Sequence, residues 1–291
     1  MRSINTIMRS IKKIDEAINA PVGDLITFRA LPTNSIEHID PFIFLNHHGY
    51  QVYPKNNYGL PFGPHPHRGF ETVTFIIHGD LTHKDNGGSE SVIKAGGVQW
   101  MTAGSGLIHS EVSSEEFKKN GGELELLQLW VNLPSKLKMT EPKYVGLQEN
   151  QIPKVEIDHG KVIIHAVSGE WEGTKGAFQP LVDIRLATIN FHKGGNYRAR
   201  IDAERNIFFY VIKGRVKVNG NEAKMHQLVE FNNDGDVIEI EALEESLLLL
   251  GHALPFNEPI VAQGPFVMNS EEEIRQAYRD YRNGKFGNWS A

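Results

Sequence analysis

Cysteine is absent from the 291 residues of the chain, which excludes disulfide bonds and metal sites built on thiolates. Long apolar runs are also missing, since none approaches the ~20 residues that a membrane-spanning helix needs. Acidic residues outnumber basic ones, 36 against 30, and the net charge of −6 argues against a surface that binds nucleic acid directly. We expect a globular, cytoplasmic protein that binds no nucleic acid directly and no membrane.

The start of the chain is basic, and we expect an ordinary N-terminal arm there rather than a transit peptide. Residues 1–13 contain four basic residues and no acidic one. They lack the continuous apolar core of a secretory signal.

Turn-forming residues are frequent between residues 21 and 64, and short apolar runs such as residues 25–28 and 42–45 lie between them. From residue 65 to residue 133 the composition is typical of strands, with a turn at residues 78–80. Short strands separated by frequent turns are typical of a sandwich or a barrel. The expected fold class is all-β.

Two short motifs bring metal-binding residue types to alternate positions. His65 and His67 are two residues apart, and so are His109 and Glu111. On a β-strand, side chains two residues apart point to the same face, so each pair can aim at one point. If the two strands are neighbours in a small barrel, three imidazoles and one carboxylate make a mononuclear metal site. Imidazole nitrogen with one hard oxygen suits iron, nickel, manganese, cobalt or zinc.

Other polar residues near these motifs are weaker candidates. Residues 71–77 alternate so that Glu71 would share the inward face with the first histidine pair. A single His-x-His is a weak signal because histidines are often structural, but two such pairs beside apolar strands favour a site. His47 and His48 are adjacent and face opposite sides of a strand, so we expect supporting or structural roles for both.

The second half of the chain resembles the first. Residues 210–215 match residues 75–80 at an offset of 135, and residues 235–242 match residues 96–103 at an offset of 139. Repetition on this scale suggests duplication of a whole fold.

The candidate ligands have no counterparts in the second half. The two offsets pair His65, His67, His109 and Glu111 with Arg200, Asp202, Leu248 and Leu250. Such residues cannot form a nitrogen-rich metal site, so the second domain should be a structural copy with an apolar interior. Residues 134–153 contain several chain breakers and are expected to be the linker. We therefore expect a metal-binding domain at residues 1–140 and a degenerate domain at residues 141–291.

The end of the chain predicts an amphipathic helix. Ser270 and Glu273 form a capping box, in which each residue caps a backbone N–H near the other. One helical face then carries Ile274, Ala277, Tyr278 and Tyr281, and Gly284 is a natural stop.

Seven short motifs together resemble the pirin family of the cupin superfamily, and they run along almost the whole chain. They are residues 29–32, 40–42, 64–74, 103–106, 108–111, 128–132 and 264–269. The resemblance implies two cupin-type β-barrel (jelly-roll) domains with a C-terminal α-helix. It also implies one transition metal ion, held in the first domain by His65, His67, His109 and Glu111.

Two positions depart from the broader cupin pattern. That pattern usually places the carboxylate ligand where Glu71 stands, so we expect Glu71 to orient a ligand or a water from beside the metal. Gly104 stands where many cupins have proline, which changes a turn but no ligand. Phe70 and Trp100 are candidate aromatic walls for a planar substrate.

The resemblance also implies an activity. Pirins include quercetin 2,3-dioxygenases, so we expect a metal-dependent dioxygenase that cleaves a flavonol-like substrate with O2. Glu111, or alternatively Glu71, would take the proton of the substrate hydroxyl. Iron, as Fe(II) or Fe(III), is the expected metal, with nickel, manganese, cobalt and zinc as alternatives. Pirin-like proteins are also partners of transcription factors and metabolic enzymes, so a regulatory binding protein with a redox-sensitive metal is the alternative reading.

Overall fold

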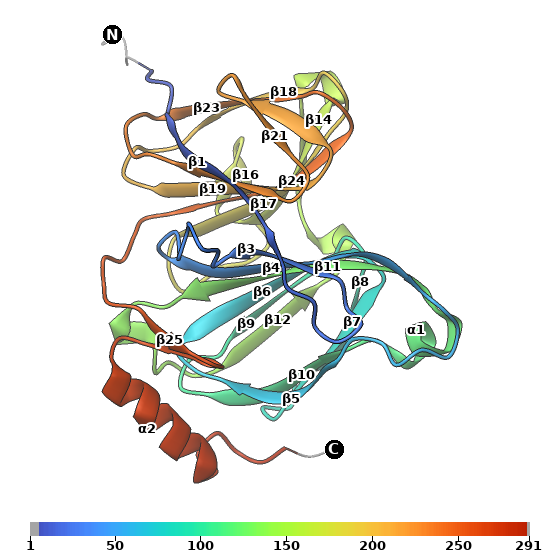
Figure 1. Cartoon of the computed structure of the whole chain (residues 1–291), viewed down its shortest axis with the longest axis vertical. Helices are drawn as coiled ribbons and strands as arrows, with labels where there is room; N and C mark the ends of the chain where they lie inside the picture. The colour runs from blue at the N-terminus through green and yellow to red at the C-terminus, as the bar shows by residue number, and fades with distance from the viewer. Residues whose placement is uncertain (1–5, 290–291) are drawn as a thin grey trace. The chain divides into compact units, whose positions relative to one another are not determined.

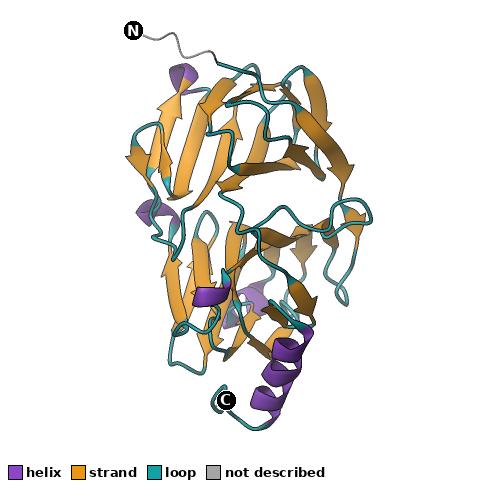
Figure 2. Ribbon diagram, turned by 90° about the vertical axis from the view of Figure 1, so that its left-hand side faces the viewer, coloured by secondary structure: helices purple, strands orange, loops and turns teal. Residues whose placement is uncertain are grey.

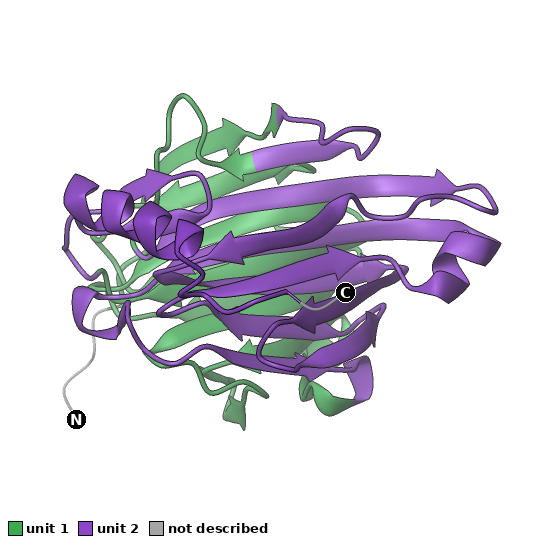
Figure 3. Cartoon of the chain, turned by 90° about the horizontal axis from the view of Figure 1, so that it is seen from below, with its two compact units in different colours: residues 1–18, 30–40, 151–255 green, residues 19–29, 41–150, 256–291 purple. Residues whose placement is uncertain are grey.

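A computed structural model describes residues 6–289 of the chain, and β-strands dominate it (Figure 2). Residues 1–5 of the expected N-terminal arm lie outside the described residues. The chain forms two compact units, unit 1 and unit 2 (Figure 3). Unit 1 contains Met1–Ile18, Ala30–Asp40 and Gln151–Pro255, and unit 2 contains Asn19–Arg29, Pro41–Asn150 and Phe256–Ala291.

The two ends of the chain are exchanged between the units. Residues 1–18 belong to the same unit as residues 151–255, and residues 256–291 belong to the same unit as residues 41–150. Within unit 1, β1 (Ile11–Glu16) pairs antiparallel with β22 (Gln227–Phe231), so part of the expected N-terminal arm is a strand. A single domain boundary at residue 140 places neither of these terminal segments in the unit to which it belongs. In addition, β12 (Lys143–Leu147) pairs with β9 (Val98–Thr102) within unit 2, so part of the expected linker is a strand.

Most strands of unit 2 form two sheets, and Figure 1 labels their strands except β2. The smaller sheet has the order β5-β10-β7-β8, and the larger has the order β12-β9-β6-β11-β4-β3-β2. Apolar side chains of both sheets, such as Ile76 and Leu81, share one core. The remaining bounds are β2 (Ile18–Asn19), β3 (Thr27–Leu31), β4 (Phe42–Tyr53), β5 (Phe62–His67), β6 (Phe70–His78), β7 (Asp80–Asp85), β8 (Glu90–Lys94), β10 (Leu107–Val112), α1 (Glu115–Asn120), β11 (Gly122–Asn132), η1 (Ser135–Leu137), η2 (Glu149–Gln151), β25 (Val261–Gln263) and β26 (Phe266–Met268).

Unit 1 repeats this plan. Its larger sheet has the order β1-β22-β19-β24-β17-β14-β13, and its smaller sheet has the order β18-β23-β20-β21. In β23 the buried Ile238 and Ile240 alternate with the exposed Glu239 and Glu241, as expected for a strand with one face on a core. The remaining bounds are β13 (Lys154–Ile157), η3 (Asp158–Gly160), β14 (Val162–Ser168), β15 (Glu170–Trp171), β16 (Thr174–Lys175), β17 (Ile184–Phe191), β18 (Asn196–Arg200), β19 (Asn206–Lys213), β20 (Arg215–Val218), β21 (Asn221–Lys224), β23 (Val237–Ala242) and β24 (Ser246–Ala253).

These two similar arrangements confirm the expected all-β fold and its duplication. β6 and β19 occupy the same place in their larger sheets, as the offset of 135 predicts. The offset of 139 is wrong. It aligns residues 96–103, which include β9, with β23, whereas β23 has the place of β10 in the smaller sheet. The lengths of the connecting loops differ between the units, so a constant sequence offset does not align the strands that follow them.

When β18 and β23 are aligned with β5 and β10, different residues of unit 1 correspond to the candidate ligands, but these residues are still unable to bind a metal. Ala199 pairs with Ile238 as His65 pairs with His109. The interior positions equivalent to His65, His67, His109 and Glu111 are therefore Ala199, Ile201, Ile238 and Ile240, all of which lie in the apolar core. Arg200 and Asp202 are exposed, and Leu248 and Leu250 lie in the same core but on β24.

The C-terminal helix α2 (Glu271–Arg282) forms where the sequence predicts it. Ser270 caps it by accepting a hydrogen bond from the Glu273 N–H, and the Glu273 carboxylate accepts one from the Asn269 N–H at 2.9 Å. Ile274 and Ala277 are buried in a cluster that includes residues of β10 and β26. Among the described residues, no helix has the length and apolarity that a membrane crossing requires.

The cap predicts a measurable contribution to stability. Ser270→Ala should lower the free energy of unfolding by about 1 kcal/mol, because it leaves an N–H of the first turn unpaired. Ser270→Asn should retain the parental value, since asparagine caps helices equally well. Chemical denaturation followed by circular dichroism measures both. Equal stability of Ser270→Ala and the parent would show that the cap contributes nothing.

Candidate metal centre

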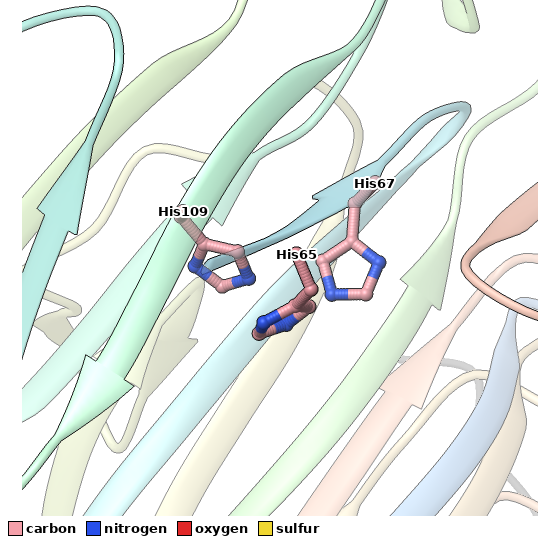
Figure 4. Close-up of side chains that lie close together, drawn as sticks. All are labelled: His65, His67 and His109. Atoms are coloured by element: carbon pink, nitrogen blue, oxygen red, sulfur yellow. The ribbon is translucent and has the colours of Figure 1, made fainter. Parts of the chain in front are cut away.

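Two neighbouring strands of the smaller sheet of unit 2 carry the candidate ligands. β5 pairs antiparallel with β10, with His65 opposite His109 and His67 opposite Leu107. Directly opposed residues share a face of the sheet, so both motifs point to the same side. The candidate ligand atoms of the three histidines all lie within 4.8 Å of one another, and Figure 4 shows their rings gathered together.

Hydrogen bonds fix the tautomers of two of these rings. Nδ1 of His65 lies 2.7 Å from the carbonyl oxygen of Gly63, and Nδ1 of His67 lies 3.1 Å from that of Pro265. A carbonyl oxygen only accepts hydrogen bonds, so both Nδ1 atoms carry the proton. Each Nε2 atom therefore presents a lone pair, which is what a metal-binding histidine needs.

His109 is fully buried, and neither of its ring nitrogens has a hydrogen-bond partner among the described residues. Burial is the main cause that lowers the pKa of His109 well below its usual range, and burial also lowers the pKa of His67 to about 3. Both rings are neutral at physiological pH and offer lone pairs. An unpaired polar group in the interior is unfavourable, so a bound transition metal fits these residues.

Glu111 lies two residues beyond His109, but three donors hold its carboxylate. Oε1 accepts hydrogen bonds from Gln99 Nε2 at 2.5 Å and from Thr74 Oγ1 at 3.2 Å. Oε2 accepts one from Gln128 Nε2 at 2.6 Å. The group of candidate ligands found among the described residues contains the three histidines and not Glu111. The structure therefore brings together three of the four expected ligands.

Glu71 does not share the face of the histidines, contrary to the expectation from alternation. Thr74 contacts Glu111, and residues 71 and 74 of one strand point to opposite faces. Glu71 instead accepts a hydrogen bond from Thr102 Oγ1 at 2.6 Å. The physical reason is Gly69, whose φ of +89° turns the chain from β5 in one sheet to β6 in the other and resets the alternation.

Two aromatic rings lie beside His67. The centroid of Phe70 is 5.0 Å from that of His67, and the centroid of Trp130 is 5.2 Å from it. Phe70 therefore lies at the site, as expected for a wall. Trp100 is paired with Val73 and so lies on the face of Glu71, away from the histidines.

Sequence reasoning missed several residues that surround the histidines. His83 is buried, with its ring centroid 5.5 Å from that of His109, and it stacks on Tyr144 at 3.8 Å. Its Nε2 lies 3.0 Å from Asp85 Oδ2. The other missed residues are Thr74, Gln99, Gln128 and Trp130. Sequence reasoning could have found Gln128 and Trp130, because they interrupt the apolar run of β11 at alternate positions.

The C-terminal segment of unit 2 holds the end of β5. Besides the Pro265 carbonyl at His67, the Val267 N–H donates to the Arg68 carbonyl oxygen at 3.0 Å. The guanidinium of Arg68 donates to Asp280 Oδ2 of α2 at 2.8 Å and lies over the ring of Phe286. These contacts fix the backbone on which His67 is mounted.

A buried lysine completes this support. Lys138 Nζ donates to the carbonyl oxygens of Gly69 and Val267, at 2.9 and 3.0 Å, and to Asn132 Oδ1 at 2.6 Å. Burial lowers the pKa of Lys138 to about 8. The ammonium group therefore joins the corner after β5 to β26 through hydrogen bonds, and no carboxylate of the described residues bonds it directly.

The adjacent histidines of β4 have other partners. His47 Nε2 lies 2.8 Å from Glu125 Oε1, and His48 Nδ1 lies 2.8 Å from Thr27 Oγ1. Neither belongs to the group of three histidines.

Known proteins resemble the chain along most of its length. Residues 25–131 match the family model Pirin, and residues 186–287 match the model Pirin C-terminal cupin domain. A Pseudomonas aeruginosa protein, whose name gives it only provisionally as a quercetin 2,3-dioxygenase, is 35% identical over 91% of this chain and 92% of its own. Pirin-1 of Arabidopsis thaliana is 38% identical over 86% of this chain and 84% of its own. The crystal structure of a quercetin 2,3-dioxygenase from Acinetobacter baumannii is 33% identical, with a TM-score of 0.92, and the match covers 97% of this chain and 99% of that one.

The histidine group predicts metal binding that depends on His67. The parent should hold about one metal ion per chain. His67→Ala should lose most of this metal, because it removes one of the three imidazoles. Elemental analysis after purification without an affinity-column metal measures this. His192→Ala, which removes an exposed histidine of unit 1, is the control and should keep the metal. Full occupancy in folded His67→Ala would rule out the site.

Glu71 predicts a pH dependence of stability. Its burial raises its pKa to about 7 from the ordinary 4.5, so between these values the folded protein holds a proton that the unfolded chain releases. Stability should fall as pH rises through this window, by up to about 3 kcal/mol. Glu71→Gln should remove this part of the fall, measured by denaturation of metal-free protein at pH 5 and pH 8. Exposed Glu116→Gln is the control, and an unchanged pH profile in Glu71→Gln would contradict the prediction.

Proposed function

The chain belongs to the pirin family, and on that premise we propose that it is a metal-dependent dioxygenase that cleaves flavonol-like substrates with O2. The observation that carries the proposal is the convergence of three imidazoles, two of them buried, in which neither ring nitrogen of His109 has a hydrogen-bond partner among the described residues. A transition metal bound there would supply a Lewis-acidic centre that lowers the pKa of a substrate hydroxyl. The similarity to the quercetin 2,3-dioxygenase of Acinetobacter baumannii supports the substrate class.

His65, His67, His109 and Glu111 are the proposed ligands. Imidazole nitrogen with one carboxylate oxygen suits iron, nickel, manganese or cobalt, and iron is our first expectation. These metals accept five or six ligands more readily than zinc does, which leaves room for substrate beside four protein ligands.

Glu111 is also the proposed base. It lies on the strand of His109, and its carboxylate accepts hydrogen bonds from one hydroxyl and two amide groups. One carboxylate oxygen would take the proton of the flavonol hydroxyl as the substrate binds. Glu71, the alternative base, lies on the other face of β6, so its placement does not support this role.

The aromatic rings beside His67 would bind the planar substrate. Phe70 and Trp130 lie 4.4 Å apart between ring centroids, and both are close to the His67 ring. Planar aromatic molecules stack on such rings, which also exclude water from the reacting groups.

Oxygen uptake tests the function. The iron-loaded protein should consume O2 with quercetin and release carbon monoxide, whereas the metal-free protein should do neither. Glu111→Gln should lower the rate about 100-fold or more if a general base is lost, with its metal content measured in parallel. No uptake by the iron-loaded parent with any flavonol would overturn the proposal and favour a regulatory role. An unchanged rate in metal-bound Glu111→Gln would remove the proposed base.

A further inference from the structure

The carboxylate of Glu111 is held by a row of polar side chains from three adjacent strands. Thr74 on β6 is paired with Gln99 on β9 and with Gln128 on β11. All three side chains donate to Glu111, which reaches them from β10 in the other sheet of unit 2. Elsewhere the same face carries apolar residues such as Ile76 and Leu126. Three side chains from three strands thus donate to one buried carboxylate, and this convergence sets the polar row apart from the apolar residues of the same face.

A tyrosine supports the direction of the first donor. Tyr144 donates its hydroxyl hydrogen to Gln99 Oε1 at 3.1 Å and accepts one from Ser91 Oγ at 2.5 Å. Because Oε1 of Gln99 accepts this hydrogen bond, its Nε2 must face Glu111. Tyr144 is held in turn by its stack on His83. Ser91, Tyr144 and Gln99 thus form one relay that ends at Oε1 of Glu111.

The direction of the second donor is fixed more strictly, by a tryptophan. Trp130 Nε1 donates to Gln128 Oε1 at 3.1 Å, and an indole N–H can only donate. Nε2 of Gln128 is therefore the atom that meets Oε2 of Glu111 at 2.6 Å. Stacking on Phe44, with 4.5 Å between ring centroids, keeps the indole in place. Trp130 also touches His67, so this relay connects a ligand ring to the carboxylate.

We propose that Gln99 and Gln128 are positioning residues that set where the Glu111 carboxylate stands relative to the three histidines, and that Tyr144 and Trp130 act through them by fixing the direction of each amide. The proposal rests on the histidine group of the proposed function. A flipped amide would set its oxygen against a carboxylate oxygen, which is unfavourable. Trp130 excludes that state for Gln128 because an indole N–H only donates, and Tyr144 supports the observed state of Gln99 by donating to its Oε1. The two amides thereby hold the Glu111 carboxylate in one orientation.

Binding of Co2+ to the whole metal-free chain tests this assignment. Gln99→Leu and Gln128→Leu should each weaken Co2+ binding about 10–100-fold, the usual cost of removing a group that orients a ligand, and should change the visible absorption spectrum of the bound ion. Trp130→Phe and Tyr144→Phe keep a ring but lose the donor, so they should show the same spectral change with a smaller loss of affinity. They also remain informative if a leucine variant fails to fold.

Double variants separate relays from general packing. If Trp130 acts through Gln128, adding Trp130→Phe to Gln128→Leu should change the Co2+ affinity no further, and the same should hold for Tyr144→Phe added to Gln99→Leu. Trp171→Phe and Tyr197→Phe are matched controls, because each removes a hydrogen bond made by a buried aromatic residue in unit 1, at 2.9 and 3.2 Å. Both controls should keep the parental affinity and spectrum.

Two results would overturn the assignment. One is parental affinity and spectrum in both folded leucine variants. The other is full additivity in both double variants, which would mean that the aromatic residues act independently of the amides. Failure of the proposed function gives a different result, because a parent without flavonol activity still binds Co2+ and still tests the order of affinities among the variants.

Discussion

The antiparallel pairing of β5 with β10 is the contact on which the candidate metal centre depends. These strands are separated in the chain by β6 to β9, and only their hydrogen-bonded register sets His65 opposite His109. A slip by one residue would turn one of the motifs to the other face of the sheet. The rest of unit 2 maintains this register: the larger sheet holds Glu111 through its row of donors, and the C-terminal segment fixes the end of β5.

The fold and the histidine group could be predicted from sequence because both depend on local periodicity. Two residues at i and i+2 on a strand share a face whatever the tertiary structure, so His65 with His67, and His109 with Glu111, were readable. Glu71 was misplaced because its prediction extended that periodicity across Gly69, where the chain leaves one sheet for the other. Alternation holds within a strand and carries no information past a change of sheet.

Other features depend on contacts between distant segments, which one sequence does not register. Gln99 and Gln128 lie in one row only because their strands are neighbours in the sheet. The carbonyl group of Pro265, which contacts His67, is 198 residues away in the sequence. The equivalent interior of unit 1 was predicted correctly as apolar but with the wrong residues. An apolar interior tolerates an error of register, because many residues of similar character can fill it. A metal centre does not tolerate an error of register, because its ligands must come from particular positions.

The crossing of the C-terminal segment into unit 2 also has a consequence for biosynthesis. The ribosome completes β5 and β10 early, but Pro265, Val267 and Asp280 emerge only after the whole of residues 151–255. Until then the proton-bearing nitrogen of His67 lacks its carbonyl partner, and Arg68 lacks its carboxylate. The nascent chain therefore carries all the candidate ligands long before it carries the groups that orient His67 and Arg68. The orientation of the His67 ring is by this order completed late in synthesis.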